Sequence, residues 1–219
     1  EEDTISVVFN IFEGEKILIE RIDILGNNIT AENVIRGELV IDEGDPFTKL
    51  GIEKSVAELK ARNIFKSVNY KVEEGSEKNL KRIKINVEER PTGEISAGAG
   101  IGTDGGRFAI SIKENNYLGE GKQLGFDLEL EKDSLAGTFS YNNPNYDFLG
   151  NSIFYSLRSE KNDVPTRGYE NSIVSGAIST SFEQYKDINL NLGLSASYDD
   201  LSTLSGASDS LKKQSGQFT

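Results

Sequence analysis

Residues 188–198 alternate strictly between apolar and small or polar side chains, and this period of two constrains the fold more than any other feature of the chain. The apolar positions are Ile188, Leu190, Leu192, Leu194, Ala196 and Tyr198. Successive side chains of an extended strand point to opposite faces, so these six share one face. That face carries no charge over about 11 residues, the length of a tilted strand that crosses a bilayer. The pattern predicts a lipid-facing strand.

Similar alternation recurs along the whole chain after Pro91. We expect about seven antiparallel strands and the start of an eighth, with charged residues such as Arg107 and Glu129 on the face opposite the apolar one. The side chains expected to face lipid are Phe108, Ile110, Ile112, Leu124, Phe126, Leu128, Leu130, Ile188, Leu190, Leu192 and Leu194. An open sheet edge is costly in lipid, so residues 92–219 are interpreted as the N-terminal part of a larger, incomplete transmembrane β-barrel.

The connections between these strands differ in character. Compact, tyrosine-containing segments at 115–119, 143–146 and 184–186 alternate with longer polar segments at 162–168 and 202–213. Short turns at one end, long loops at the other and an aromatic girdle are typical of outer-membrane barrels. A soluble antiparallel sandwich shows the same alternation with its apolar face turned inward, and it is the alternative interpretation.

The chain before Pro91 has a different organisation. Residues 15–91 predict the order β-α-α-β-β, a small α+β domain. A strand over 17–25 precedes a short helix, which Thr30 is expected to cap. A second helix is expected over 48–62, with Ile52, Val56 and Leu59 on one apolar stripe. Two strands with alternating apolar residues complete the domain.

The first 14 residues do not fit into this domain. Phe9-Asn10-Ile11-Phe12-Glu13 resembles Ile85-Asn86-Val87-Glu88-Glu89 at the end of the domain. Residues 1–14 are therefore interpreted as the last strand of a preceding copy of the same unit. Chance similarity between two short strands is the alternative.

Composition narrows the possible chemistry. The chain has no cysteine and no histidine, and its formal net charge is −12. Thiol chemistry, the commonest metal ligand and the commonest general base are thus absent. The acidic balance disfavours binding to nucleic acid, and adjacent carboxylates such as Glu88 and Glu89 point to opposite faces of a strand. We expect no enzymatic activity, no metal or cofactor and no nucleic-acid partner.

Motifs along the whole chain resemble those of BamA-type outer-membrane β-barrel assembly factors. Gly44-Asp45-Pro46-Phe47 and the segment 59–68 resemble a POTRA domain, in which two helices lie across a three-stranded sheet. Residues 87–102 resemble the junction between the last POTRA domain and the barrel. Residues 115–121 and 143–146 resemble two periplasmic turns of that family.

The resemblance implies a non-enzymatic function. Such a protein receives unfolded β-barrel clients, contacts outer-membrane lipids and accessory lipoproteins, and promotes client insertion into the bacterial outer membrane, with its POTRA domain in the periplasm. Its first barrel strand lines a lateral gate for client strands. Here that strand would include Ile95, Ala97, Gly98, Ala99, Gly100, Ile101 and Gly102.

Three alternative functions are compatible with the same sequence. Within the superfamily these are a two-partner-secretion barrel and a TamA-like translocation barrel. Outside it, a soluble β-rich binding or adhesin module is possible. The Gly98-x-Gly100-x-Gly102 run does not indicate a phosphate site, because no helix opens after it.

Overall fold

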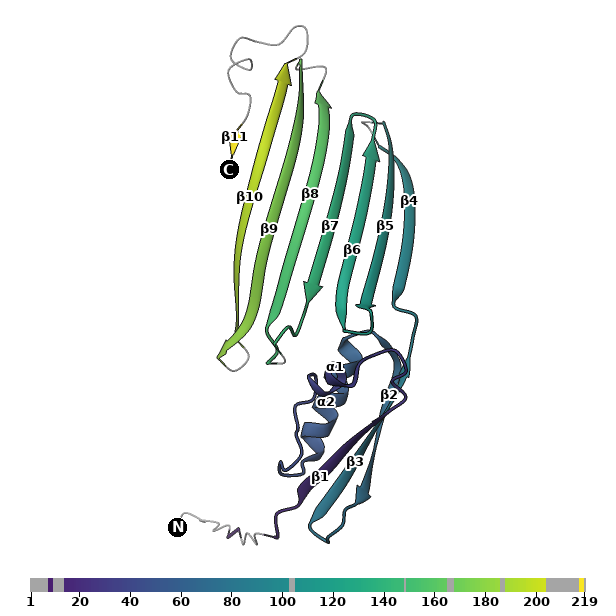
Figure 1. The fold of residues 1–219 in the computed structure, drawn as a ribbon, viewed down its shortest axis with the longest axis vertical. Coiled ribbons are helices and arrows are strands. Elements are labelled where there is room, and N and C mark those ends of the chain that lie inside the picture. The colour runs from purple at the N-terminus through teal and green to yellow at the C-terminus, as the bar shows by residue number, and fades with distance from the viewer. Residues whose placement is uncertain are drawn as a thin grey trace, which may run out of the picture.

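The computed structural model consists of an α+β unit at one end and a long sheet at the other (Figure 1). It describes residues 8–9, 14–102, 105–147, 149–164, 168–185, 188–203 and 217–218. The strand predicted over residues 1–14 falls almost entirely outside the described residues.

The α+β unit has the predicted order of elements. It comprises β1 (Leu18–Leu25), α1 (Glu32–Arg36), α2 (Lys49–Ala61), β2 (Phe65–Glu74) and β3 (Leu80–Glu89). The sheet order is β1-β3-β2, with β1 parallel and β2 antiparallel to β3. The central strand β3 is also the last strand of the unit, and it leads directly into the long sheet.

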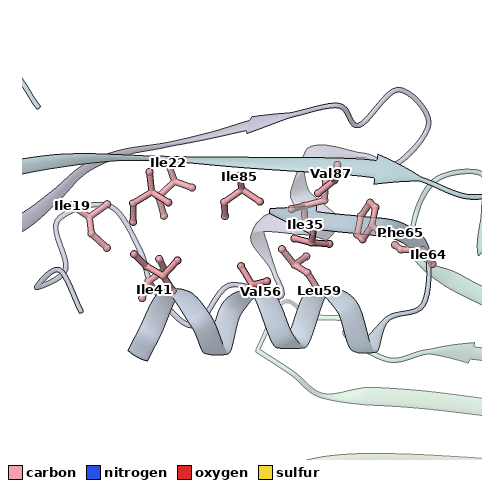
Figure 2. Packing of buried hydrophobic residues seen from close by; sticks show 13 residues of the cluster. Ile19, Ile22, Ile35, Ile41, Val56, Leu59, Ile64, Phe65, Ile85 and Val87 are labelled. Atoms are coloured by element: carbon pink, nitrogen blue, oxygen red, sulfur yellow. The ribbon is translucent and has the colours of Figure 1, made fainter. Parts of the chain in front are cut away.

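Helix α2 covers one face of this sheet. It begins after Thr48, whose hydroxyl accepts a hydrogen bond from the Gly51 N–H at 3.2 Å. This cap satisfies one of the free amides of the first turn. Figure 2 shows Val56 of α2 facing the buried Ile85 of β3, and Leu59 of α2 facing Ile35. The predicted apolar stripe of the second helix thus forms the core of the unit.

The cap predicted for the first helix is wrong. Helix α1 begins after Ala31, and no side chain caps it. Thr30 is nevertheless buried, because its hydroxyl accepts a hydrogen bond from the Asn116 side-chain amide at 2.9 Å. The Thr30 hydroxyl therefore contacts the long sheet and does not cap helix α1.

The long sheet is antiparallel throughout. Its strands are β4 (Gly93–Gly102), β5 (Gly105–Tyr117), β6 (Lys122–Glu131), β7 (Ser134–Asn143), β8 (Ser152–Val164), β9 (Tyr169–Tyr185), β10 (Ile188–Thr203) and β11 (Gln217–Phe218). Each strand pairs with its neighbours in chain order, from β4 at one edge to β11 at the other. The predicted incomplete antiparallel barrel is confirmed as a fold.

One expected loop is shorter than the sequence suggested. Pairing between β8 and β9 continues to Val164 and Tyr169, so it includes residues 162–164 of the polar segment 162–168. An ion pair between Lys161 and Glu170 at 2.8 Å joins the two strands near this end. Polar residues therefore extend the hairpin here, because cross-strand charge pairs stabilise a sheet as apolar pairs do. The segment 202–213 lies almost wholly outside the described residues.

The sheet is a single layer whose apolar face is uncovered in the described part of the chain. Side chains such as Leu157, Val174 and Leu192 are more than half exposed. In a two-layer sandwich the same side chains would interdigitate with a second sheet. The described residues include no helix long and apolar enough to cross a membrane.

Candidate functional site

Strand β4 contains all seven residues predicted to line the gate, and it forms one edge of the long sheet. Among the described residues it pairs with β5 alone, and every one of its ten residues is exposed. Backbone N–H and C=O groups at such an edge are free to pair with another strand. An edge of this kind is what strand addition uses, and the role of β4 as a gate remains a prediction.

The two faces of β4 differ in chemistry. Ile95, Ala97 and Ala99 are opposite Ile112, Ile110 and Phe108 of β5, so they share its apolar face. Ile101 has the same facing by alternation. Gly98, Gly100 and Gly102 lie on the other face, where an added Cβ would meet nothing within 4 Å. A strand with so few side-chain contacts is held mainly by its backbone pairing with β5.

The residues predicted to face lipid form in-register rows across neighbouring strands. Phe108 is opposite Leu130, Ile110 opposite Leu128 and Ile112 opposite Phe126. Leu124 continues this face of β6 and is opposite Tyr141. On β10, Ile188, Leu190, Leu192 and Leu194 are all at least 40% exposed. Their exposure to a lipid phase remains a prediction.

The opposite face of the sheet is polar and internally hydrogen-bonded. Ser111 donates to the Asp127 carboxylate at 2.6 Å, and the Arg158 guanidinium donates to the Thr138 hydroxyl at 3.1 Å. Arg107 forms an ion pair with Glu129 at 3.4 Å. Such a face suits the aqueous interior of a barrel.

The α+β unit also has one open edge, on β2. The outer edge of β1 is covered by the segment 43–47, with the Ile19 N–H donating to the Asp45 carbonyl at 2.9 Å and the Phe47 N–H donating to the Ile17 carbonyl at 2.8 Å. In contrast, no described strand pairs with the outer edge of β2. The sequence did not distinguish these two edges.

The α+β unit is joined to the long sheet by the turn between β5 and β6. The Ala31 N–H donates to the Gly119 carbonyl at 2.9 Å, next to the buried hydrogen bond between Thr30 and Asn116. Asn116 also accepts a hydrogen bond from the Gly121 N–H at 2.8 Å. One asparagine therefore shapes the turn and holds the neighbouring unit.

Two glycines of this turn are required by their surroundings. Gly119 has φ +74°, and an added Cβ would collide with the carbonyl of Ile29. Gly121 has φ +65° and packs against Val34, while its carbonyl accepts from the Arg62 guanidinium at 2.6 Å. Glycine tolerates a positive φ and permits this close backbone approach.

A largely buried ion pair lies beside the joint. The Arg62 side chain is 11% exposed and the Glu38 side chain 15%, with 3.6 Å between Nε and Oε1. Burial raises the pKa of Glu38 and lowers the pKa of Arg62, while the charge of each opposes these shifts in the other. Next to this pair, the Asn145 amide donates to the Gly37 carbonyl at 2.9 Å and thus attaches the turn after β7.

Glu89, at the end of β3, holds the loop that forms the joint. Its carboxylate accepts hydrogen bonds from the N–H groups of Asn28, Ile29 and Thr30 at 2.6 to 3.1 Å. Burial alone would raise the pKa of Glu89, but these hydrogen bonds outweigh it and hold the pKa below its ordinary value. The loop therefore depends on an ionised carboxylate.

We expect Glu89→Gln to increase amide hydrogen exchange at residues 28–30 by about tenfold or more, because a hydrogen bond to a charged group contributes roughly 1.5–3 kcal/mol. Glu88→Gln is the matched control, since the Glu88 carboxylate bonds Lys66 and Ser67 instead. Because the pKa of Glu89 is lowered in the folded state, its contribution is complete above pH about 4.3 and is lost as the pH falls through the folded pKa. Equal exchange in the two variants would contradict this role.

Both the sequence and the fold are similar to those of known proteins. Residues 17–90 match the POTRA family model, described as a surface antigen variable number repeat. The chain is 30% identical to the outer membrane protein assembly factor BamA of Neorickettsia risticii, over 97% of this chain and 29% of that protein. Its fold is similar to that of BamA from Haemophilus ducreyi lacking POTRA domains 1–3, with a TM-score of 0.75 and 24% identity over 87% of this chain and 37% of that one.

The chain is of the BamA type. It combines a POTRA domain with antiparallel strands of an incomplete barrel, and it spans less than a third of the length of the curated relative described above. The fold is also similar to CdiB from Acinetobacter baumannii, with a TM-score of 0.61 and 12% identity over 85% of this chain and 38% of that one. At this identity, the CdiB likeness concerns the fold alone.

Several residues of the joint were not singled out from the sequence. Arg62 was predicted only as the end of a helix, and Glu89 only as part of the junction segment 87–102 and as a neighbour of Glu88. The motif 115–121 was noted for its resemblance to a periplasmic turn, but nothing in it indicated which segment it contacts. The strand pattern did identify β4, because alternation and small residues are local features of the sequence.

Proposed function

We propose that this chain belongs to an outer-membrane protein assembly factor that receives unfolded β-barrel clients and promotes their folding and insertion into the outer membrane. The observation that carries the proposal is the open edge of β4, with ten exposed residues directly after the POTRA domain. A client strand would add to this edge through main-chain hydrogen bonds. No covalent bond is made or broken in this step, so the activity is not enzymatic and requires no cofactor.

The position of the POTRA domain supports a receiving role. It lies at the end of the long sheet where β4 begins, and its own open edge is β2 (Figure 1). Under this proposal the POTRA domain lies in the periplasm, where clients and accessory lipoproteins reach it, and the long sheet contacts outer-membrane lipids. Extended client segments could pair with β2 before they reach β4.

The proposal is tested with the full-length protein reconstituted in liposomes and an unfolded β-barrel client. We expect client folding to be faster than in empty liposomes. Gly98→Pro and Ala99→Pro separate the roles of the strand, because neighbouring N–H groups point alternately to β5 and to the open edge. The variant that removes an N–H bonded to β5 should weaken the sheet. The variant that removes an N–H facing the open edge should leave the sheet folded and slow client assembly. Wild-type client folding in the variant that stays folded would overturn the proposal.

A translocation barrel is the second candidate, and the likeness to CdiB is the observation that favours it. A two-partner-secretion or TamA-like protein would pass its substrate through the pore instead of adding strands at the edge. The same liposomes distinguish these functions. Entry of an unfolded partner into the vesicle lumen, without faster folding of β-barrel clients, would favour translocation.

A further inference from the structure

A polar cavity of about 320 Å³ lies between the POTRA domain and the long sheet. Glu38 and Arg62 line it from the POTRA domain, and Glu120, Lys122 and Asn143 line it from the sheet and its first turn. The Nε of Arg62 is buried and has no hydrogen-bond partner among the described residues, since Glu38 is too distant at 3.6 Å. The Arg62 side chain at the wall of the cavity is thus paired with Glu38 by charge, without a hydrogen bond from its Nε.

The cavity lies at the margin of the predicted lipid-facing surface. Lys122 is on the same face of β6 as Leu124, two residues further along the strand. By the same alternation, Asn143 is on the same face of β7 as Tyr141, which is opposite Leu124. The polar side chains therefore stand at the POTRA end of the apolar rows, where a bilayer places its headgroups.

An apolar groove of about 590 Å³ adjoins the cavity on β8 to β10. Tyr146 lines both of them, and Ile153 of the groove is directly opposite Asn143 of the cavity. Within the groove, Thr180 stands in register between the larger Ile153 and Leu192. This small side chain leaves a depression in an otherwise apolar surface. Together, the cavity and the groove have the amphipathic form of a lipid.

The charges of the cavity indicate which headgroup fits. The two carboxylates of Glu38 and Glu120 balance the two cations Arg62 and Lys122, and Lys122 forms an ion pair with Glu120. A balanced site complements a headgroup that carries both a phosphate and an ammonium. A purely anionic headgroup would place the carboxylates against its phosphate, which is unfavourable at short range.

We propose that the cavity and the groove together bind one phospholipid of the periplasmic leaflet, with a zwitterionic headgroup between the POTRA domain and the turns and an acyl chain over Thr180. The inference rests on the proposed function only in placing the long sheet in a membrane. Such a lipid would bridge the POTRA domain and the sheet, in addition to the direct hydrogen bonds of the joint.

The test is native mass spectrometry of the full-length protein, purified in detergent and incubated with equimolar phosphatidylethanolamine and phosphatidylglycerol that carry identical dioleoyl chains. We expect one retained lipid, with phosphatidylethanolamine preferred. Lys122→Gln should reduce its retention about tenfold, since it removes a charge-assisted contact. Lys113→Gln, on the polar face of β5, is the control and should retain lipid as the wild type does.

The groove is tested with Thr180→Leu, which narrows it, against Gly137→Leu, which places a leucine on the apolar face of β7 where nothing lies within 4 Å of an added Cβ. Only the first variant should lose the lipid. Soluble glycerophosphoethanolamine distinguishes a lipid site from a headgroup site, because it cannot occupy the groove and should not displace the lipid. If Thr180→Leu does not fold, lipid retention in the two lysine variants decides whether the site binds lipid.

Equal retention in the two lysine variants, or displacement by the soluble headgroup, would overturn the inference. Client folding in liposomes is measured on the same preparations. Loss of lipid selectivity with intact client folding would contradict only the proposed lipid site. Selective lipid binding by a wild-type protein that does not fold clients would contradict only the proposed function.

Discussion

Arginine in place of Leu128 or Leu192 is expected to destabilise the membrane-inserted protein by about 2–4 kcal/mol where the side chain lies near the bilayer midplane. Leu128 lies in the middle of an apolar row, in register with Ile110 and Gly137. The cost arises because a charged group must leave water for hydrocarbon. Urea titration of the full-length protein in lipid vesicles, followed by intrinsic fluorescence, measures the change.

Ser156→Arg is the matched control for these two variants. Ser156 lies on the polar face of β8 between Ser140 and Ala177, so a long side chain has space and access to water. Gly125 is less suitable although it shares that face, because an added Cβ would lie 2.5 Å from the Ser140 hydroxyl. Similar losses at Ser156 and at the leucines would show that the apolar face is not the one in lipid.

Alanine in place of Gly119 is expected to detach the POTRA domain from the first turn of the long sheet. The added Cβ collides with the carbonyl of Ile29, a backbone atom that cannot rotate away. Relief of this overlap requires the turn and the POTRA loop to separate, which breaks the hydrogen bond from Ala31 to Gly119. Spin labels on the POTRA domain and on β6 should report a broader distribution of distances.

Gly150→Ala provides the control for backbone strain. Gly150 also has a positive φ, +85°, but nothing lies within 4 Å of an added Cβ. Both variants bear the roughly 1–2 kcal/mol cost of a left-handed alanine, and only Gly119→Ala adds the collision. An unchanged distance distribution in Gly119→Ala would mean that contacts of another turn, such as the hydrogen bond from Asn145 to Gly37, hold the joint without this one.

The roles of Leu128 and Gly119 could be predicted from the sequence to different degrees. Leu128 could be assigned to a face from the sequence, because alternation along one strand fixes which side chains lie together. Likewise, the second helix was predicted over residues 48–62 with its stripe at Ile52, Val56 and Leu59, since helical periodicity involves residues a few positions apart. The structure confirmed these elements.

The role of Gly119 could not be predicted in this way, because its neighbour Ile29 lies 90 positions earlier in the chain. Thr30 is a similar case. Its hydroxyl had a plausible local use as a cap, yet the folded chain brings Asn116 close enough to bind it instead. The Thr30 hydroxyl can accept from few donors at once, and the tertiary fold decides whether a helix amide or the Asn116 amide is the donor.

The sequence by itself determined the order of strands and helices, the apolar and polar faces of each strand, and the small residues of β4. These properties follow from local periodicity and residue size. Only the tertiary structure decided that β2 rather than β1 has an open edge, that Arg62 and the glycines of one turn form the joint, and that a polar cavity meets an apolar groove at Tyr146. Each of these depends on segments far apart in the chain, whose meeting is fixed by packing and hydrogen bonding of the whole fold.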